Sequence, residues 1–184
     1  ALGDNLIISE VMFDPLGDEP DEEWIELYNG TSMSVDVLGY EISERTGGSP
    51  TGTENRRSIV ATCPTTSASN YMRPYGTAST VIAPGSHLIV QFCGGGSYLN
   101  DSGDTVALYQ AATTTVAIDS ETYPATPNGK SHARIPDGGA WVDPIPTPGS
   151  ANTATVAELR AEGWTDAEIE AVGIMLEHSA ESSI

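Results

Sequence analysis

The sequence predicts an all-β protein, a β-sandwich, followed by a short C-terminal helical hairpin. From residue 5 to about residue 150, short apolar runs are separated by turns rich in Gly, Pro, Asn and Asp. Thr, Ser, Ala and Gly are abundant, as is common in all-β proteins with many turns. After residue 152 the pattern changes to helical spacing. We therefore expect a sandwich over residues 1–152 and a helical extension over residues 153–184, within the size range of one domain with an appendage.

Short strands bounded by turn residues are expected throughout the first part of the chain. The segment 24–28 alternates with a period of two, so Ile25 and Leu27 face one side while Trp24 and Tyr28 face the other. Trp24 and Tyr28 are expected either to be covered by the stretch 47–78 or to be available for contact with a partner. The expected strands span residues 6–12, 23–29, 35–43, 81–82, 87–93, 105–109, 116–119 and 131–135.

A long polar stretch with little periodicity, about residues 47–78, interrupts this pattern and is expected to be an anchored loop. It contains Cys63, and Cys93 is the only other cysteine. With no CxxC motif and no nearby His, the pair indicates a disulfide more than a metal site. Two buried free thiols are the alternative. A bond between them would pin the loop to the strand that ends at Cys93.

The C-terminal extension carries two helix-start signals. Thr155 with Glu158, and Thr165 with Glu168, each fit a capping box, and Gly163 suits a stop between two helices. The apolar stripe of this hairpin consists of Leu159, Trp164, Ile169, Val172, Met175 and Leu176. The stripe must be buried, either on the sandwich or on another subunit or domain; disorder of the isolated tail is the remaining alternative.

The charge balance is strongly acidic, with 26 Asp and Glu against 7 Lys and Arg and a formal net charge of −19. Such a surface repels phosphate backbones and anionic lipid, which argues against nucleic acid and membrane surfaces as partners. No run of 18 apolar residues occurs, so no membrane insertion is expected. The expected disulfide and the acidity together favour an extracellular or cell-surface protein, with residue 1 as the end left by signal-peptide removal.

An acidic loop with turn residues follows the first strand. Calcium prefers six to eight oxygen ligands in flexible geometry, and close carboxylates without a cation would repel one another. The spacing is not that of an EF-hand, and a solvated acidic loop is the alternative. The candidate calcium ligands are Asp14, Asp18, Glu19, Asp21 and Glu22.

Two N-glycosylation sequons, at Asn29 and Asn100, fall at predicted turns and are therefore expected to be accessible. Asn100, Asp101, Ser102 and Asp104 resemble a calcium-binding turn, but ordinary turn chemistry is the simpler explanation.

The sequence holds no catalytic motif of the HExxH, GxSxG, P-loop or GxGxxG kind. Its histidines, His87, His132 and His178, are scattered along the chain. Glu23 and Glu26 are expected on opposite faces of one strand, which does not suit glycosidic acid–base work. We therefore expect no enzyme activity and no catalytic residue.

Six motifs, in this order and spacing, resemble the lamin-tail domain in its prokaryotic, secreted form. They occupy residues 8–15, 22–29, 82–90, 99–108, 134–139 and 147–152. The resemblance implies an immunoglobulin-like sandwich that serves as an interaction module in exported proteins, often beside hydrolase or adhesion domains. It implies no catalytic centre and does not account for the cysteine-bearing stretch or the helical tail.

Two functions are expected to compete. The first is a structural subunit of a cell-surface filament, sheath or matrix that joins copies of itself or other surface proteins, with calcium as a candidate cofactor. The alternative is an accessory binding domain that tethers an exported protein to glycan or protein through an exposed aromatic face. A third function, an exported hydrolase, requires converging titratable groups that the sequence does not provide.

Overall fold

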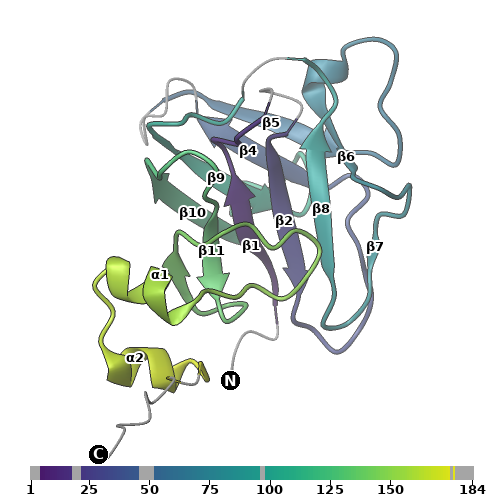
Figure 1. The fold of residues 1–184 in the computed structure, drawn as a ribbon. Coiled ribbons are helices and arrows are strands. Elements are labelled where there is room, and N and C mark those ends of the chain that lie inside the picture. The colour runs from purple at the N-terminus through teal and green to yellow at the C-terminus, as the bar shows by residue number, and fades with distance from the viewer. Residues whose placement is uncertain (1–4, 18–21, 46–51, 96–97, 175, 177–184) are drawn as a thin grey trace, which may run out of the picture.

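The computed structural model describes residues 5–17, 22–45, 52–95, 98–174 and 176. It is a β-sandwich with two short helices at its C-terminal end (Figure 1), so the predicted all-β fold class is confirmed. Within these residues no helix is long and apolar enough to cross a membrane. The strands are β1 (Leu6–Met12), β2 (Trp24–Asn29), β3 (Val35–Asp36), β4 (Glu41–Arg45), β5 (Glu54–Ile59), β6 (Tyr71–Pro74), β7 (Val81–Ile82), β8 (His87–Phe92), β9 (Gly103–Tyr109), β10 (Asp119–Pro124), β11 (His132–Ile135) and β12 (Ala140–Val142), and the helices are α1 (Val156–Ala161) and α2 (Asp166–Ala171).

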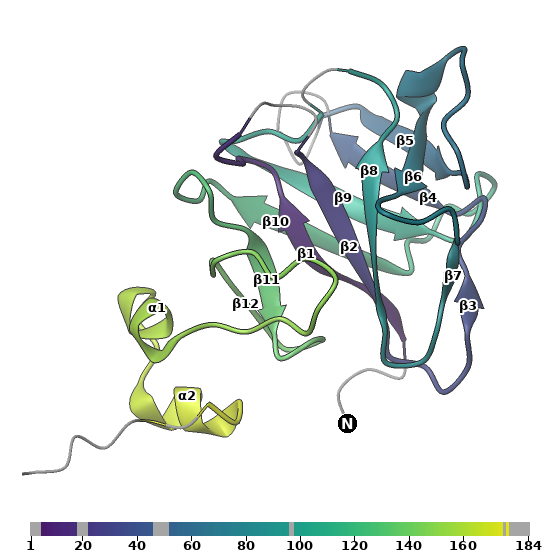
Figure 2. The same ribbon diagram turned by 45° about the vertical axis from the view of Figure 1, so that its right-hand side comes forward.

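One curled sheet carries most of the fold, in the order β10-β9-β4-β5-β6-β8-β2-β1-β11-β12. Its neighbours are antiparallel except β5 and β6, which run parallel. The curl places β1, β2 and β8 in one layer in front of β4, β9 and β10 (Figures 1 and 2). β3 and β7 form a separate two-stranded ribbon at the side of the molecule away from the helices (Figure 2).

The core lies between the two layers. Ile25 and Leu27 are fully buried in it, as the alternation of β2 predicts, and Val106 and Leu108 meet them from β9. Phe13 stacks on Tyr123 of β10 with ring centroids 4.1 Å apart. Burying these side chains stabilises the fold by roughly 2 kcal/mol each, so the core is the main source of stability.

Polar side chains join the two ends of the curled sheet. The Ile8 N–H of β1 donates to Asp119 Oδ2 of β10 at 2.9 Å, and Arg134 Nη2 of β11 donates to both oxygens of the same carboxylate at 2.9 and 3.0 Å. His132 places one ring nitrogen 3.2 Å from Glu121 of β10 and the other 2.9 Å from Asp143. Side chains of edge strand β10 are therefore bound by the backbone of β1 and by side chains of β11.

Part of the stretch expected as a long polar loop belongs to the sheet, which corrects that expectation for two segments of its described residues, 52–78. β5 and β6 lie inside it and connect β4 to β8. β5 was not predicted from the sequence because Ile59 is its only apolar residue. Polar side chains of β5 form hydrogen bonds and ion pairs with neighbouring strands; for example, Arg57 Nη1 donates to Glu44 Oε1 at 2.8 Å. The disulfide is confirmed: Cys63 and Cys93 have Cα atoms 5.4 Å apart and are bonded.

Two expected strands also differ from the structure. The strand predicted at 116–119 begins only at Asp119, and Val116 is 79% exposed in the preceding turn. The strand predicted at 35–43 is split into β3 and β4 by a turn in which Gly39 has φ +78°. An L-residue rarely adopts that conformation, so the glycine ends the first segment.

The helical extension packs on its own sandwich, the first of the alternatives above. Both predicted capping boxes are present, with Thr155 and Thr165 accepting from the N–H groups of Glu158 and Glu168. Leu159 of α1 and Ile169 of α2 are fully buried in a second apolar cluster. The strands β11 and β12 supply the other buried members of this cluster, Ile135 and Val142.

Candidate functional site

The outer face of β2, β8 and β6 carries a row of three side chains in direct register. Trp24 lies opposite Gln91, and Gln91 lies opposite Arg73. Because directly paired residues of antiparallel strands project to the same face, the three side chains stand side by side. Their chain neighbours Ile25 and Val90 point the other way and are fully buried in the core. The register therefore places an indole, an amide and a guanidinium along one line across the sheet.

Two grooves meet on this face. One, of about 510 Å³, is mainly apolar and is lined by Leu16, Trp24, Tyr75, Ile89, Ile145 and Pro148 among others. Three of these side chains are highly exposed for apolar residues: Leu16 at 81%, Ile145 at 63% and Tyr75 at 57%. Clustered exposed apolar residues commonly mark an interaction site.

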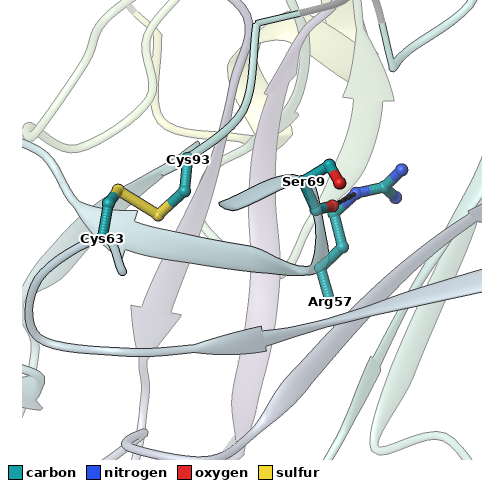
Figure 3. The surroundings of a disulfide bond; sticks show 4 residues. All are labelled: Arg57, Cys63, Ser69 and Cys93. Carbon is teal, nitrogen blue, oxygen red and sulfur yellow. Dashed lines mark hydrogen bonds between the residues drawn. A yellow bond between two sulfur atoms is a disulfide. The ribbon is translucent and has the colours of Figure 1, made fainter. Parts of the chain in front are cut away.

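The second groove, of about 860 Å³, lies beside the disulfide and is lined by Arg73 and Phe92 as well as both cysteines. Tyr75 and Gln91 line both grooves, so the two lie side by side, and together we call them the trough. The disulfide holds the segment after β5 against the end of β8 (Figure 3). Arg57 Nε donates to the Ser69 carbonyl at 2.9 Å and fixes the other side of the same segment (Figure 3). The wall of the larger groove is thus covalently tethered.

A segment after β12, residues 143–152, forms the opposite wall, and we call it the strap. It crosses in front of β1 and β2 (Figure 1), and Ile145 and Pro148 contribute to the apolar groove. Its tightest turn runs from Thr147 to Ser150, closed by the Ser150 N–H donating to the Thr147 carbonyl at 3.1 Å. Gly149 has φ +75°, as the third position of a type II turn requires, and proline, here Pro148, is common at the second position.

Two buried carboxylates of the sheet bind this turn. Glu10 accepts from the Thr147 N–H at 3.2 Å, and Glu26 accepts from the Gly149 N–H at 2.6 Å. Both glutamates are fully buried, and they lie opposite each other on β1 and β2. Ser9 Oγ donates to Glu26 at 2.9 Å, and Ser131 Oγ donates to Glu10. The donors of the turn therefore satisfy charges that would otherwise be costly in the interior.

Burial shifts the titration of this pair. It raises the pKa of Glu26 to about 7, although the Gly149 N–H and the nearby His87 lower it. Burial likewise raises the pKa of Glu10, against the hydrogen bonds from Ser131 and Thr147. The His87 ring lies 3.1 Å from the Asp137 carboxylate. Burial lowers the pKa of His87, but Asp137 and Glu26 outweigh burial, so the pKa of His87 is raised. The attachment of the strap is therefore sensitive to protons near neutral pH.

The bulge in β1 explains how two carboxylates come to share this face. Pairing with β2 shifts between Ile8 and Glu10, which leaves Ser9 as an extra residue. In an unbroken strand Glu10 would share the inward face of Leu6 and Ile8. The bulge turns Glu10 outward and Val11 inward, where Val11 is fully buried. Sequence reasoning missed Glu10, Arg73 and Tyr75 as site residues, since only the register shows what lies beside them.

Of the candidate interaction residues on β2, only Trp24 lies in the trough. Its exposed fraction is 8%, so it forms the floor. Tyr28 is half-buried and packs on the His87 ring with centroids 4.8 Å apart. In the tail, Trp164, Ile169 and Leu176 belong to the cluster on β11 and β12, while Val172 lines a shallow hollow beside Trp164. Met175 lies outside the described residues.

The candidate calcium ligands are only partly described. Asp18, Glu19 and Asp21 lie outside the described residues. Asp14 Oδ1 accepts from Asn128 Nδ2 at 2.5 Å, and Glu22 is an exposed lining residue of the apolar groove. Within the described part of the chain, no group of three or more acidic, His or Cys side chains is arranged to hold a metal.

The two sequons differ in accessibility. Asn29 is fully buried, and its amide nitrogen donates to the carbonyls of Met33 and Ile82 at 2.8 and 2.9 Å. The expectation that Asn29 is accessible is therefore wrong: the amide closes the turn instead of facing solvent. Asn100 is half-buried, and its Nδ2 donates to Asp104 Oδ2 at 3.0 Å.

A family model described as Lamin Tail Domain matches residues 2–125, which is more than half of the 184-residue chain. The matched span runs from β1 to the end of β10 and includes the trough residues of β2, β6 and β8. The strap and both helices follow it. No curated protein matches the chain.

Proposed function

Because the chain belongs to the lamin tail domain family, whose immunoglobulin-like sandwich is a non-catalytic type of fold, we propose that it is a non-enzymatic interaction module of an exported protein. In this proposal the module binds an extended chain in the trough of β2, β8 and β6. A disulfide is compatible with an oxidising, extracellular compartment, where such bonds persist. The net charge of −19 argues against a nucleic-acid partner.

The gathering of Leu16, Tyr75 and Ile145 around the trough carries the proposal. Each is more than half exposed, yet together they line one groove instead of being scattered over the surface. The walls are fixed, one by the disulfide and the other by the bound strap, so little ordering is needed when a ligand enters. Preformed grooves of this kind bind with a smaller entropic cost than mobile surfaces.

The proposal is tested by titrating the isotope-labelled chain with extended polymers, both proline-rich peptides and neutral oligosaccharides. Amide chemical shifts are expected to change at Trp24, Tyr75 and Gln91. Tyr75→Ala should weaken the binding about tenfold or more, since it removes a shared wall of both grooves. Leu38→Ser is the control. Leu38 is 55% exposed but does not line the trough, so this variant should bind normally. Shift changes confined to other faces would reject the proposal.

A second candidate function is assembly of copies into a cell-surface structure, with calcium at the joints. The observation that favours it is a second group of exposed apolar residues near the β3–β7 ribbon: Met33, Leu38 and Val81 are 72, 55 and 50% exposed. Light scattering with calcium and then with chelator tests it. Ordered polymers that dissolve on chelation support assembly, whereas a monomer in both conditions leaves the binding module.

A further inference from the structure

We propose that the trough takes an extended polypeptide segment, with a carboxylate at Arg73, apolar residues over Tyr75 and Trp24, and a Lys or Arg at Glu22. This inference rests on the proposed function and names the class of partner. It follows from the distribution of charge, the chemistry of the lining and the length of the trough.

Charge distinguishes the two ends of the trough. Among the described residues, Arg73 is the one charged residue that lines the larger groove, and Glu22 is the one that lines the apolar groove. Most described basic residues have a carboxylate within 4.0 Å; for Arg73 the described chain provides none. An exposed guanidinium without a carboxylate, in a protein of net charge −19, is suited to an incoming acidic group.

Glu22 supplies the opposite charge where the apolar groove begins. Its carboxylate lies against Gly17, where an added methyl group would come within 2.1 Å of Glu22 Oε2. The described residues give this carboxylate no basic partner, and its side chain is exposed. A cationic side chain of the ligand would find an unneutralised carboxylate there.

The lining between these ends favours a peptide over a sugar. Leu16, Ile89 and Ile145 are aliphatic, and Pro15, Pro146 and Pro148 add rigid apolar rings. Every ring of a neutral glycan carries hydroxyls, and covering them with aliphatic side chains costs free energy. Apolar residues of an extended, proline-containing segment satisfy this lining, and Trp24 and Tyr75 supply the aromatic surfaces on which such segments are commonly bound.

The length of the trough sets the spacing of the two charges. Trp24, Gln91 and Arg73 occupy three adjacent strands, which places about 10 Å between the first and the last. Glu22 precedes Trp24 by two residues along the chain. A total span on the order of 15 Å corresponds to four or five extended residues.

The test uses calorimetry and amide shifts on the full chain with the peptide acetyl-Glu-Pro-Leu-Pro-Lys-amide. Binding in the trough is expected, and Arg73→Glu should weaken it about tenfold or more by replacing attraction with repulsion. The peptide acetyl-Lys-Pro-Leu-Pro-Lys-amide should show the reverse preference and bind the Arg73→Glu variant more tightly than the parent. Arg160→Glu, at an exposed position of α1, is the control and should leave both affinities unchanged.

The outcomes separate this inference from the proposed function. Binding of both peptides with no response to Arg73→Glu would overturn the charge assignment. Shift changes in the trough with cellohexaose but not with the peptide would overturn the polypeptide class, while the trough would remain a binding site. An absence of trough shifts with any of these ligands would overturn the inference and the proposed function together.

Discussion

Glu10 and Glu26 lie directly opposite each other on adjacent strands, fully buried, and each carboxylate accepts an N–H of the same strap turn. When both carboxylates are ionised, two like charges lie close together in the interior. The electrostatic free energy of the pair therefore depends on pH. The strap also forms a wall of the trough, so this pair of glutamates holds one wall of the candidate site in place.

The first prediction concerns the pH dependence of stability. The folded-state pKa of Glu26, about 7, lies above its ordinary value of 4.5, so the folded protein retains a proton that the unfolded chain releases. Protonation of Glu26 therefore stabilises the folded state, fully so below about pH 4.5. As the pH rises from there through 7, the free energy of unfolding should fall by about 3 kcal/mol because of this residue. Urea unfolding between pH 4.5 and 8.5 measures it.

Glu26→Gln should flatten this decline, because the amide oxygen still accepts from Gly149 but does not titrate. The raised pKa values of Glu10 and His87 act in the same direction, so part of the slope should remain. Glu170→Gln, on the exposed face of α2, is the control and should keep the full slope. Parallel pH profiles for the parent and Glu26→Gln would contradict the prediction.

The second prediction concerns the disulfide. Cys63 and Cys93 are 30 residues apart, and opening a loop of that size releases chain entropy worth about 3–4 kcal/mol in the unfolded state. The double variant Cys63→Ser, Cys93→Ser should lose about that much free energy of unfolding in chemical denaturation. The parent treated with reductant should match it. A loss below about 1 kcal/mol in both would show that the segment is held by other contacts, such as Arg57 with Ser69.

The third prediction separates the helical tail from the main core. Leu159 is fully buried in the smaller apolar cluster, so Leu159→Ala should cost about 2–5 kcal/mol there. Amide exchange should accelerate in α1 and α2 while Ile25 and Leu108 in the main core stay protected. Ala161→Ser, at an exposed position of α1, should leave exchange unchanged. Equal loss of protection in both clusters would mean that the tail and sandwich unfold as one unit.

The fourth prediction concerns calcium at the acidic loop that contains Asp14 and Glu22. Native mass spectrometry at millimolar calcium should show one bound ion per chain, since clustered carboxylates are suitable ligands. Asp14→Asn combined with Glu22→Gln should weaken the binding, whereas Asp166→Asn, at an exposed site in α2, should not. A spectrum without bound calcium would leave the loop as a solvated acidic segment.

Local signals in the sequence were sufficient for several features. The alternation in residues 24–28 predicted that Ile25 and Leu27 face the core, and both are fully buried. The capping boxes that begin at Thr155 and Thr165 formed as expected, because a cap depends on residues within one turn of the helix. The family resemblance was confirmed by the match over residues 2–125, which contains four of its six motifs; the motifs at 134–139 and 147–152 lie beyond the matched span.

Other features depended on contacts between distant parts of the chain. β5 is polar because its side chains form ion pairs across strands, such as Arg57 with Glu44, so no apolar pattern marks it. Asn29 begins a glycosylation sequon, but its side-chain amide donates a hydrogen bond to the carbonyl of Ile82, 53 residues away. Neither fact follows from a local window, since both partners are set by the sheet order.

The sequence by itself determined the class of fold, the disulfide and the helix starts, since these follow from periodicity, from the cysteine count and from residues that are neighbours in the chain. Only the tertiary structure decided the site. One extra residue at Ser9 turns Glu10 to the outer face beside Glu26, and strand register alone brings Trp24, Gln91 and Arg73 into one row. The physical reason is that side chains alternate with a period of two, so a shift of one residue changes the face of every residue that follows.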